Sequence, residues 1–167
     1  MSVTDHRAAA PVSIPCFVLT VSDTRTLETD ESGRAIDEML TASGHVVVAR
    51  AVVPDEPGAV VAAVREHLDH GEVRAIIATG GTGLAARDTT VEAVASLFER
   101  RIDGFGELFR MLSFEEIGPA AMLSRACAGI ANGRVIFVLP GSHSAIRLAM
   151  RRLILLELGH IVRELTK

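Results

Sequence analysis

A short glycine-rich segment is the clearest candidate for ligand chemistry. It comprises Thr79, Gly80, Gly81, Thr82 and Gly83, and it lies between an apolar run and a helical pattern. Glycine permits positive φ angles and close approach of the backbone, and the N-terminus of a following helix favours an anion. These features predict a phosphate-binding loop in which valine at Gly81 would reduce ligand affinity more than stability. A tight strand-to-helix turn without a ligand explains the same glycines equally well.

Two aspartates near predicted strand ends are candidates for binding a metal ion. Asp55 precedes Pro57 and a helical pattern, and Asp88 follows the glycine-rich segment. If the fold brings them together, the two carboxylates and the phosphates of a nucleotide can hold Mg²⁺. Both can instead be helix N-caps, because Asp is a preferred capping residue and Thr89 and Glu92 have the spacing of a capping box. Their proximity in the fold distinguishes the two interpretations.

Two further polar segments come at the ends of predicted strands. They are Ser22-Asp23 and Pro140-Gly141-Ser142. In an open parallel sheet, ligands bind at the carboxyl ends of the strands, so these segments together can hold a polar, phosphorylated ligand. His143 follows directly, where a surface histidine without a role is the simpler interpretation.

The elements that would position these segments alternate between strands and helices. Short apolar or valine-rich runs predict strands, and apolar residues at helical spacing follow each of them. The predicted strands are at 14–21, 45–53 and 74–78, and the predicted helices lie around 36–44, 60–68 and 91–98. Asn132-Gly133 is a typical hairpin turn between two apolar runs. We therefore predict a three-layer α/β fold: a mainly parallel sheet with one antiparallel hairpin strand and helices on both faces.

Two apolar regions exceed what one small sheet can cover. The predicted last helix, 142–165, carries apolar residues around most of its circumference, and 105–122 is also rich in large apolar side chains. Phe105 and Phe109 are interpreted as packing residues of a lid or a subunit contact rather than as a base-stacking platform. These surfaces predict a homo-oligomer.

Composition excludes several classes of protein. The chain has 167 residues, 49% of them hydrophobic, and a formal net charge of -4, so we expect a sizeable core and no nucleic-acid binding through bulk charge. Lys167 is the only lysine, which rules out the P-loop motif with its phosphate-binding lysine. Cys16 and Cys127 form no C-x-x-C pair, and no apolar run is long enough to span a membrane. We expect a cytoplasmic protein with a disordered leader at 1–12 and one domain at 13–167.

Several motifs in fixed order resemble one family, the MoaB/MogA molybdenum cofactor biosynthesis proteins. The resemblance extends from Ile14 onward, and its main motifs are Thr79 to Gly83, Arg87 to Thr90, Gly104 to Glu107 and Leu139 to Ser142. The MoaB branch is nearer, judged by the stretch 113–129. The chain departs from the pattern at His143, where many relatives have proline.

The resemblance implies a molybdopterin adenylyltransferase, which in the presence of Mg²⁺ transfers AMP from ATP to the terminal phosphate of molybdopterin and releases pyrophosphate. It implies that Asp55 and Asp88 are catalytic and bind Mg²⁺, and that residues 79–83 contact phosphate or pterin. It also implies that Ser22, Asp23 and 140–142 line the site. A trimer or hexamer, and hand-over of the product to a metal-insertion protein, belong to the same expectation.

Two other hypotheses stay open beside this one. The protein can be a non-catalytic molybdopterin-binding or carrier module, which keeps the pocket but transfers no AMP. Some MoaB-type proteins are dispensable for adenylylation when a MogA-type enzyme is present, so the family resemblance does not decide between the two. A nucleotide pyrophosphate hydrolase of the same fold is the third hypothesis, although such domains usually belong to longer chains.

Overall fold

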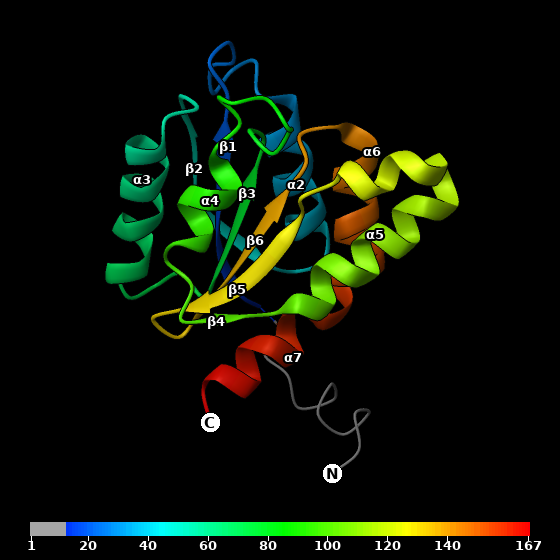
Figure 1. The fold of residues 1–167 in the computed structure, drawn as a ribbon. Coiled ribbons are helices and arrows are strands. Elements are labelled where there is room, and N and C mark those ends of the chain that lie inside the picture. Colours follow the sequence, from blue (N-terminus) through cyan, green and yellow to red (C-terminus); the bar gives the residue numbers. More distant parts are fainter. Residues whose placement is uncertain (1–12) are drawn as a thin grey trace.

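The computed structural model describes residues 13–167, which are built around a six-stranded sheet (Figure 1). The strand order across the sheet is β2-β1-β3-β6-β5-β4. The strands are β1 (Pro15–Val21), β2 (Val46–Val53), β3 (Ala75–Thr79), β4 (Arg100–Arg101), β5 (Cys127–Ala131) and β6 (Arg134–Leu139). The leader predicted at 1–12 lies outside the described residues.

The sheet is mainly parallel, as the alternation of strands and helices predicts. Strands β2, β1, β3 and β6 are parallel to their neighbours in this order, whereas β5 is antiparallel to both β6 and β4. The hairpin between β5 and β6 turns at Asn132 and Gly133, whose φ angles are 46° and 69°. Positive φ at both positions is typical of a type I′ turn, for which Asn-Gly is preferred. The predicted hairpin strand is therefore confirmed, and the two-residue strand β4 adds to it.

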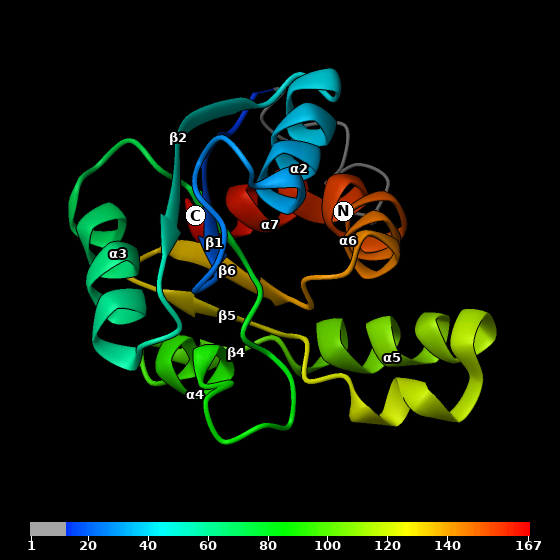
Figure 2. The same cartoon turned by 90° about the horizontal axis from the view of Figure 1, so that it is seen from above.

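Helices cover both faces of the sheet, which confirms the three predicted layers (Figure 2). One face carries α3 (Pro57–Asp69) and α4 (Thr90–Ala95), and the other carries α2 (Glu31–Ala42), α5 (Asp103–Ile117), α6 (His143–Ala149) and α7 (Leu155–Leu165). A 3₁₀ helix at Gly118–Leu123 follows α5, and a π-helical segment at Met150–Ile154 joins α6 to α7. Within 13–167, no helix has both the length and the apolar character needed to cross a membrane.

Each face of the sheet has its own apolar core. In β1, Cys16 and Val18 belong to the core beneath α2 and α6, whereas Phe17 and Leu19 belong to the core beneath α3. Successive side chains of a strand point to opposite faces, so a strand covered on both faces is apolar at every position. This is why the central strands are continuous apolar runs in the sequence.

The last helical region packs against other helices as well as against the sheet. Ile146 and Leu158 are fully buried, and α6 contacts both α2 and α5. Much of its broad apolar surface is therefore covered within the chain. Phe105 and Phe109 of α5 are also buried, and the Phe105 ring packs edge-on against Phe137 with 5.1 Å between centroids. Their interpretation as packing residues is confirmed.

A buried carboxylate fixes the start of α2 at the sheet edge. Asp30 is 1% exposed, and its Oδ1 accepts a hydrogen bond from the Gly33 amide at 2.8 Å as the N-cap of α2. Its Oδ2 accepts hydrogen bonds from the Thr20 hydroxyl at 2.9 Å and from Arg50 Nη2 at 3.2 Å. One carboxylate thus joins β1, β2 and α2, and these partners offset the cost of removing its charge from water.

We expect Arg50→Ala to lower the free energy of unfolding by about 3 kcal/mol, because the variant leaves the buried Asp30 carboxylate without its counter-charge. Arg65→Ala, at an exposed position of α3, is the matched control and should change stability by less than about 0.5 kcal/mol. Urea denaturation at neutral pH measures both. Equal stabilities of the two variants would contradict the role assigned to Arg50.

Candidate functional site

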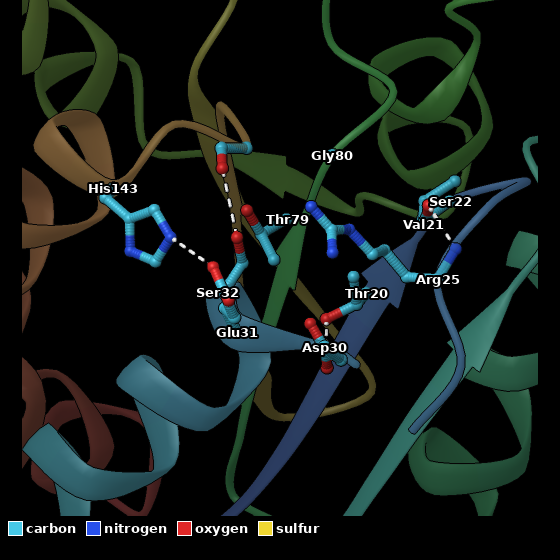
Figure 3. Close-up of a pocket in the computed structure, with 11 residues that line it drawn as sticks. Thr20, Val21, Ser22, Arg25, Asp30, Glu31, Ser32, Thr79, Gly80 and His143 are labelled. Carbon is cyan, nitrogen blue, oxygen red and sulfur yellow. Dashed lines mark hydrogen bonds and ion pairs between the residues drawn. The ribbon is translucent and has the colours of Figure 1, made fainter. Parts of the chain in front are cut away.

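A polar cavity of about 240 Å³ opens at the carboxyl ends of β1 and β3 (Figure 3). The first turn of α2 and the residues that lead into α6 form its other walls. Four of the predicted site residues line it, namely Ser22, Thr79, Gly80 and Gly141. The fold therefore brings three of the predicted polar segments to one place at the sheet edge where ligands bind in open parallel sheets.

Several residues that line this cavity were missed by the sequence reasoning. They are Thr20, Arg25, Asp30, Glu31 and Ser32. Figure 3 shows the Arg25 side chain extending across the cavity from the loop after β1, where it supplies a cation. Ser32 Oγ donates a hydrogen bond to the Gly141 carbonyl at 3.1 Å and so ties α2 to the loop before α6. The available signal was Asp30, a preferred N-cap residue type, in the polar stretch ahead of the predicted helix.

His143 also lines the cavity and faces Glu31. Its Nε2 lies 3.4 Å from Glu31 Oε2, so the pair joins the start of α6 to the start of α2 (Figure 3). His143 thus places an imidazole in the lining of the cavity.

The glycine-rich segment turns the backbone sharply at the end of β3. Gly80 and Gly81 have φ angles of 93° and 63°. A Cβ on Gly80 would lie 2.3 Å from the Val21 carbonyl oxygen, and a Cβ on Gly81 would lie 2.2 Å from Thr90 Oγ1 and 2.7 Å from Asp55 Oδ2. The turn itself therefore requires glycine at both positions. The predicted tight strand-to-helix turn is therefore present, and phosphate binding by it stays a prediction. Valine at Gly81 would disrupt the turn itself, because its side chain has no space.

Asp23 links three loops through its carboxylate. Its Oδ1 accepts a hydrogen bond from the Asp55 amide at 3.0 Å, and its Oδ2 forms an ion pair with Arg87. The loops after β1 and β2 and the loop before α4 are thereby held together. The predicted site residues Asp23 and Asp55 are neighbours, and Arg87 is a charged residue that the sequence reasoning did not assign to the site.

The N-cap interpretation of Asp55 and Asp88 is wrong, because neither carboxylate caps the helix that follows it. The N-cap of α3 is Glu56 and that of α4 is Thr89, and neither makes a side-chain cap bond. Asp55 Oδ1 instead accepts hydrogen bonds from the amide and hydroxyl of Thr89, at 3.5 and 3.4 Å. Asp88 Oδ2 accepts one from the Ala85 amide at 3.2 Å, within its own loop.

The oxygen atoms beside Gly81 and Gly83 are of the kind that Mg²⁺ prefers. Within 13–167, Asp55 Oδ2 and Asp88 Oδ1 accept no hydrogen bond, and the buried Thr90 hydroxyl has no partner. Carboxylate and hydroxyl oxygens are hard ligands, and Mg²⁺ at nucleotide sites typically binds one or two carboxylates plus phosphates. No group of three or more His, Cys, Asp or Glu residues in the described part of the chain is placed to hold a metal ion, so the phosphates of a substrate would have to complete the set.

The remaining predicted residues support the site through hydrogen bonds. The Pro140 carbonyl accepts one from Thr79 Oγ1 at 3.0 Å, and Ser142 Oγ accepts one from the Ala145 amide at 3.3 Å as the N-cap of α6. Thr82 is 8% exposed. Thr82, Pro140 and Ser142 lie outside the lining of the cavity, and the bonds of Pro140 and Ser142 stabilise the loop that carries Gly141.

Comparison with known proteins points to one family. Residues 17–160 match the domain family described as "Probable molybdopterin binding domain". The chain is 49% identical to molybdenum cofactor biosynthesis protein B of Halalkalibacterium halodurans and 46% identical to that of Bacillus subtilis, with 100% of this chain and 99% of each relative covered.

Solved structures with the same fold agree with these relatives. A crystal structure of a molybdenum cofactor biosynthesis protein B has a TM-score of 0.91 at 47% identity, covering 94% of this chain and 98% of that one. The tungsten cofactor synthesizing protein MoaB from Pyrococcus furiosus has a TM-score of 0.84 at 36% identity, covering 95% of this chain and 100% of that one.

We expect Gly81→Ala to lower the free energy of unfolding by about 3 kcal/mol, because alanine disfavours positive φ and its Cβ overlaps Thr90 and Asp55. Gly71→Ala is the matched control, since a Cβ at that position would meet no atom within 4 Å. Urea denaturation measures both variants. If the two variants were equally stable, the steric requirement for glycine at Gly81 would be refuted.

Proposed function

Since this chain belongs to the molybdopterin-binding domain family, we propose that its role in molybdenum cofactor biosynthesis is that of an adenylyltransferase. It transfers AMP from ATP to the terminal phosphate of molybdopterin in a reaction that depends on Mg²⁺. A phosphate oxygen of molybdopterin attacks the α-phosphorus of ATP and forms a new P–O bond. The bond from that phosphorus to the β-phosphate oxygen breaks, and pyrophosphate leaves with the electron pair.

The observation that carries this proposal is the position of Asp55 and Asp88 around the glycine turn. The two carboxylates come from different loops, and each has one oxygen that accepts no hydrogen bond from the rest of 13–167. Neither carboxylate caps a helix, and both lie beside the glycine-rich segment, Asp55 next to Gly81 and Asp88 next to Gly83. Joining two polyanions requires alignment and charge neutralisation more than covalent chemistry, and these carboxylates are suited to that task once Mg²⁺ is bound.

Within the proposed function, each part of the site has a distinct task. Asp55 and Asp88 hold Mg²⁺, which neutralises phosphate charge when it is bound. Phosphates bound by this ion would lie beside the glycine-rich segment, since Asp55 packs against Gly81 and Asp88 against Gly83. Arg25 in the cavity supplies a positive charge for an anionic group of the substrate.

A second candidate function is a non-catalytic molybdopterin-binding or carrier module. One observation favours it: the polar cavity is complete without Asp55 and Asp88, neither of which lines it. A ligand can therefore be bound there without any contribution from the two aspartates. The two functions differ in whether pyrophosphate is released.

We expect Asp55→Asn and Asp88→Asn to remain folded and to bind molybdopterin, but to transfer AMP about 10² to 10³-fold more slowly, because the neutral amide loses the charge that the metal ion requires. Of the two, Asp88→Asn should be the more damaging. The assay mixes protein, Mg-ATP and molybdopterin and measures adenylylated pterin together with pyrophosphate. Asp69→Asn, at an exposed position at the end of α3, is the control for loss of a carboxylate.

Two results would count against the adenylyltransferase proposal. Near-normal turnover by both variants at saturating Mg-ATP would show that the aspartates are not needed for transfer. Molybdopterin binding by the wild-type protein without any pyrophosphate release would favour the carrier module instead.

Self-association is also part of the proposed function. Six large apolar side chains of α5 and the 3₁₀ helix are exposed, and they are here called the α5 patch: Leu108, Met111, Phe114, Ile117, Met122 and Leu123. Their exposed fractions range from 46% to 79%, and apolar side chains exposed in such number on one segment are typical of an interface. We propose a trimer or hexamer that buries this patch, acts in the cytoplasm and passes its product to a metal-insertion protein.

We expect light scattering at micromolar concentration to give the mass of a trimer or hexamer. The double variant Met111→Glu/Phe114→Glu should give a smaller mass, because charge in an apolar interface is costly. Glu115→Lys, on the same helix at an exposed polar position, is the control and should keep the wild-type mass. A monomeric mass for the wild-type protein would contradict the proposal.

A further inference from the structure

Arg125 makes more hydrogen bonds to the loop between β3 and α4 than any proposed site residue does. It lies between the 3₁₀ helix and β5, far from this loop in sequence. Its Nε donates a hydrogen bond to the Thr82 carbonyl at 3.0 Å, and its Nη2 donates to the carbonyls of Gly83 at 2.7 Å and Asp88 at 2.8 Å. Its Nη1 forms an ion pair with Glu92 of α4, which orients the guanidinium. One planar cation therefore binds both ends of the loop.

These contacts determine which way the amide groups of the loop point. In a trans peptide the C=O and the following N–H point in opposite directions. The three carbonyls bound by Arg125 therefore direct the amides of Gly83, Leu84 and Thr89 away from it. The Thr89 amide indeed donates to Asp55 Oδ1, and the amides of Gly83 and Leu84 have no acceptor within 13–167. Successive free amides of this kind form an anion-binding concavity.

Other residues also restrain the loop, through the Arg87–Asp23 ion pair and the bonds from Thr89 to Asp55, but none of them bonds three of its carbonyls. Gly83 to Arg87 are exposed and belong to no helix or strand, and Leu84 is 66% exposed. Ordering such a segment costs conformational entropy at every residue. Charge-assisted hydrogen bonds are stronger than neutral ones, so a single arginine with three of them is a major restraint on the loop.

Arg125 does not line the 240 Å³ cavity. Its own surroundings are a second cavity of about 390 Å³, lined among others by Arg101, Arg110 and Cys127. It shares no lining residue with the 240 Å³ cavity. Its contacts with the loop are to backbone carbonyls, so we assign it a role through the backbone.

We propose that Arg125 is a positioning residue for AMP transfer, which holds Asp88 and the amides of Gly83 and Leu84 in the orientation that the reaction needs. This inference rests on the proposed adenylyltransferase function. Arg125 comes from a remote segment of the chain and helps to fix the position of Asp88, the carboxylate proposed to bind the metal ion.

The test compares Arg125→Met, Arg125→Lys and the control Arg101→Met, which lines the same cavity but bonds no atom of the loop. We expect Arg125→Met to lower kcat about 10 to 100-fold, as misplacement of a reacting group by about 1 Å does. The Mg²⁺ concentration for half-maximal rate should rise about tenfold, while KM for molybdopterin changes little. Arg125→Lys should recover only part of the loss, because one ammonium cannot replace the planar fork.

Hydrogen exchange at residues 82–89 provides a readout that does not depend on activity. In Arg125→Met the exchange of these amides should become faster, with no change in the cores, whereas Arg101→Met should match the wild-type protein. If the wild-type protein transfers no AMP, the proposed function fails, and faster exchange would still establish the control of the loop by Arg125. Unchanged exchange, or a wild-type kcat and Mg²⁺ requirement in a folded Arg125→Met protein, would overturn the inference.

Discussion

Two consecutive backbone positions with positive φ at the end of β3 determine how the polar edge of the sheet is assembled. Gly80 packs against the backbone of Val21, so the chain leaving β3 lies closer to the end of β1 than a side chain would allow. Gly81 then packs against Thr90 of α4 and against Asp55 from the loop after β2. Three connections of the sheet thus meet because two residues have no side chain, and the candidate site lies where they meet.

Arginine–carboxylate pairs then hold these connections in place. The pairs join segments that are remote in sequence, and they are Asp23 with Arg87, Asp30 with Arg50, and Glu92 with Arg125. They differ in burial: Arg87 is 69% exposed, whereas Asp30 is 1% exposed, so the first contributes little to stability and the second is structural. Asp55 and Asp88 belong to no ion pair within 13–167, which leaves their charge for a ligand.

The apolar interior of the sheet provides support, whereas its polar edge carries the charged groups of the candidate site. The side chains of β3 are completely buried, and those of β6 nearly so, which makes the centre of the sheet a rigid support for the loops at its carboxyl end. The chain carries a net charge of -4, yet Arg25, Arg87 and Arg125 lie at this edge. The local field at a site depends on the groups around it, so the overall acidity of the chain does not prevent the binding of anions.

Features that depend on neighbours in the chain could be predicted from the sequence alone. The apolar runs predicted the central strands, and Asn132-Gly133 predicted the hairpin. The polar residues after each strand predicted which edge of the sheet carries the candidate site. These predictions were possible because periodicity and turn preference are local properties of the sequence. Only the tertiary structure showed that Asp55 bonds Thr89 rather than capping α3, and that Arg125 bonds the glycine loop. Such contacts join residues more than 30 positions apart, and their partners are selected by the packing of the layers, which no local pattern encodes.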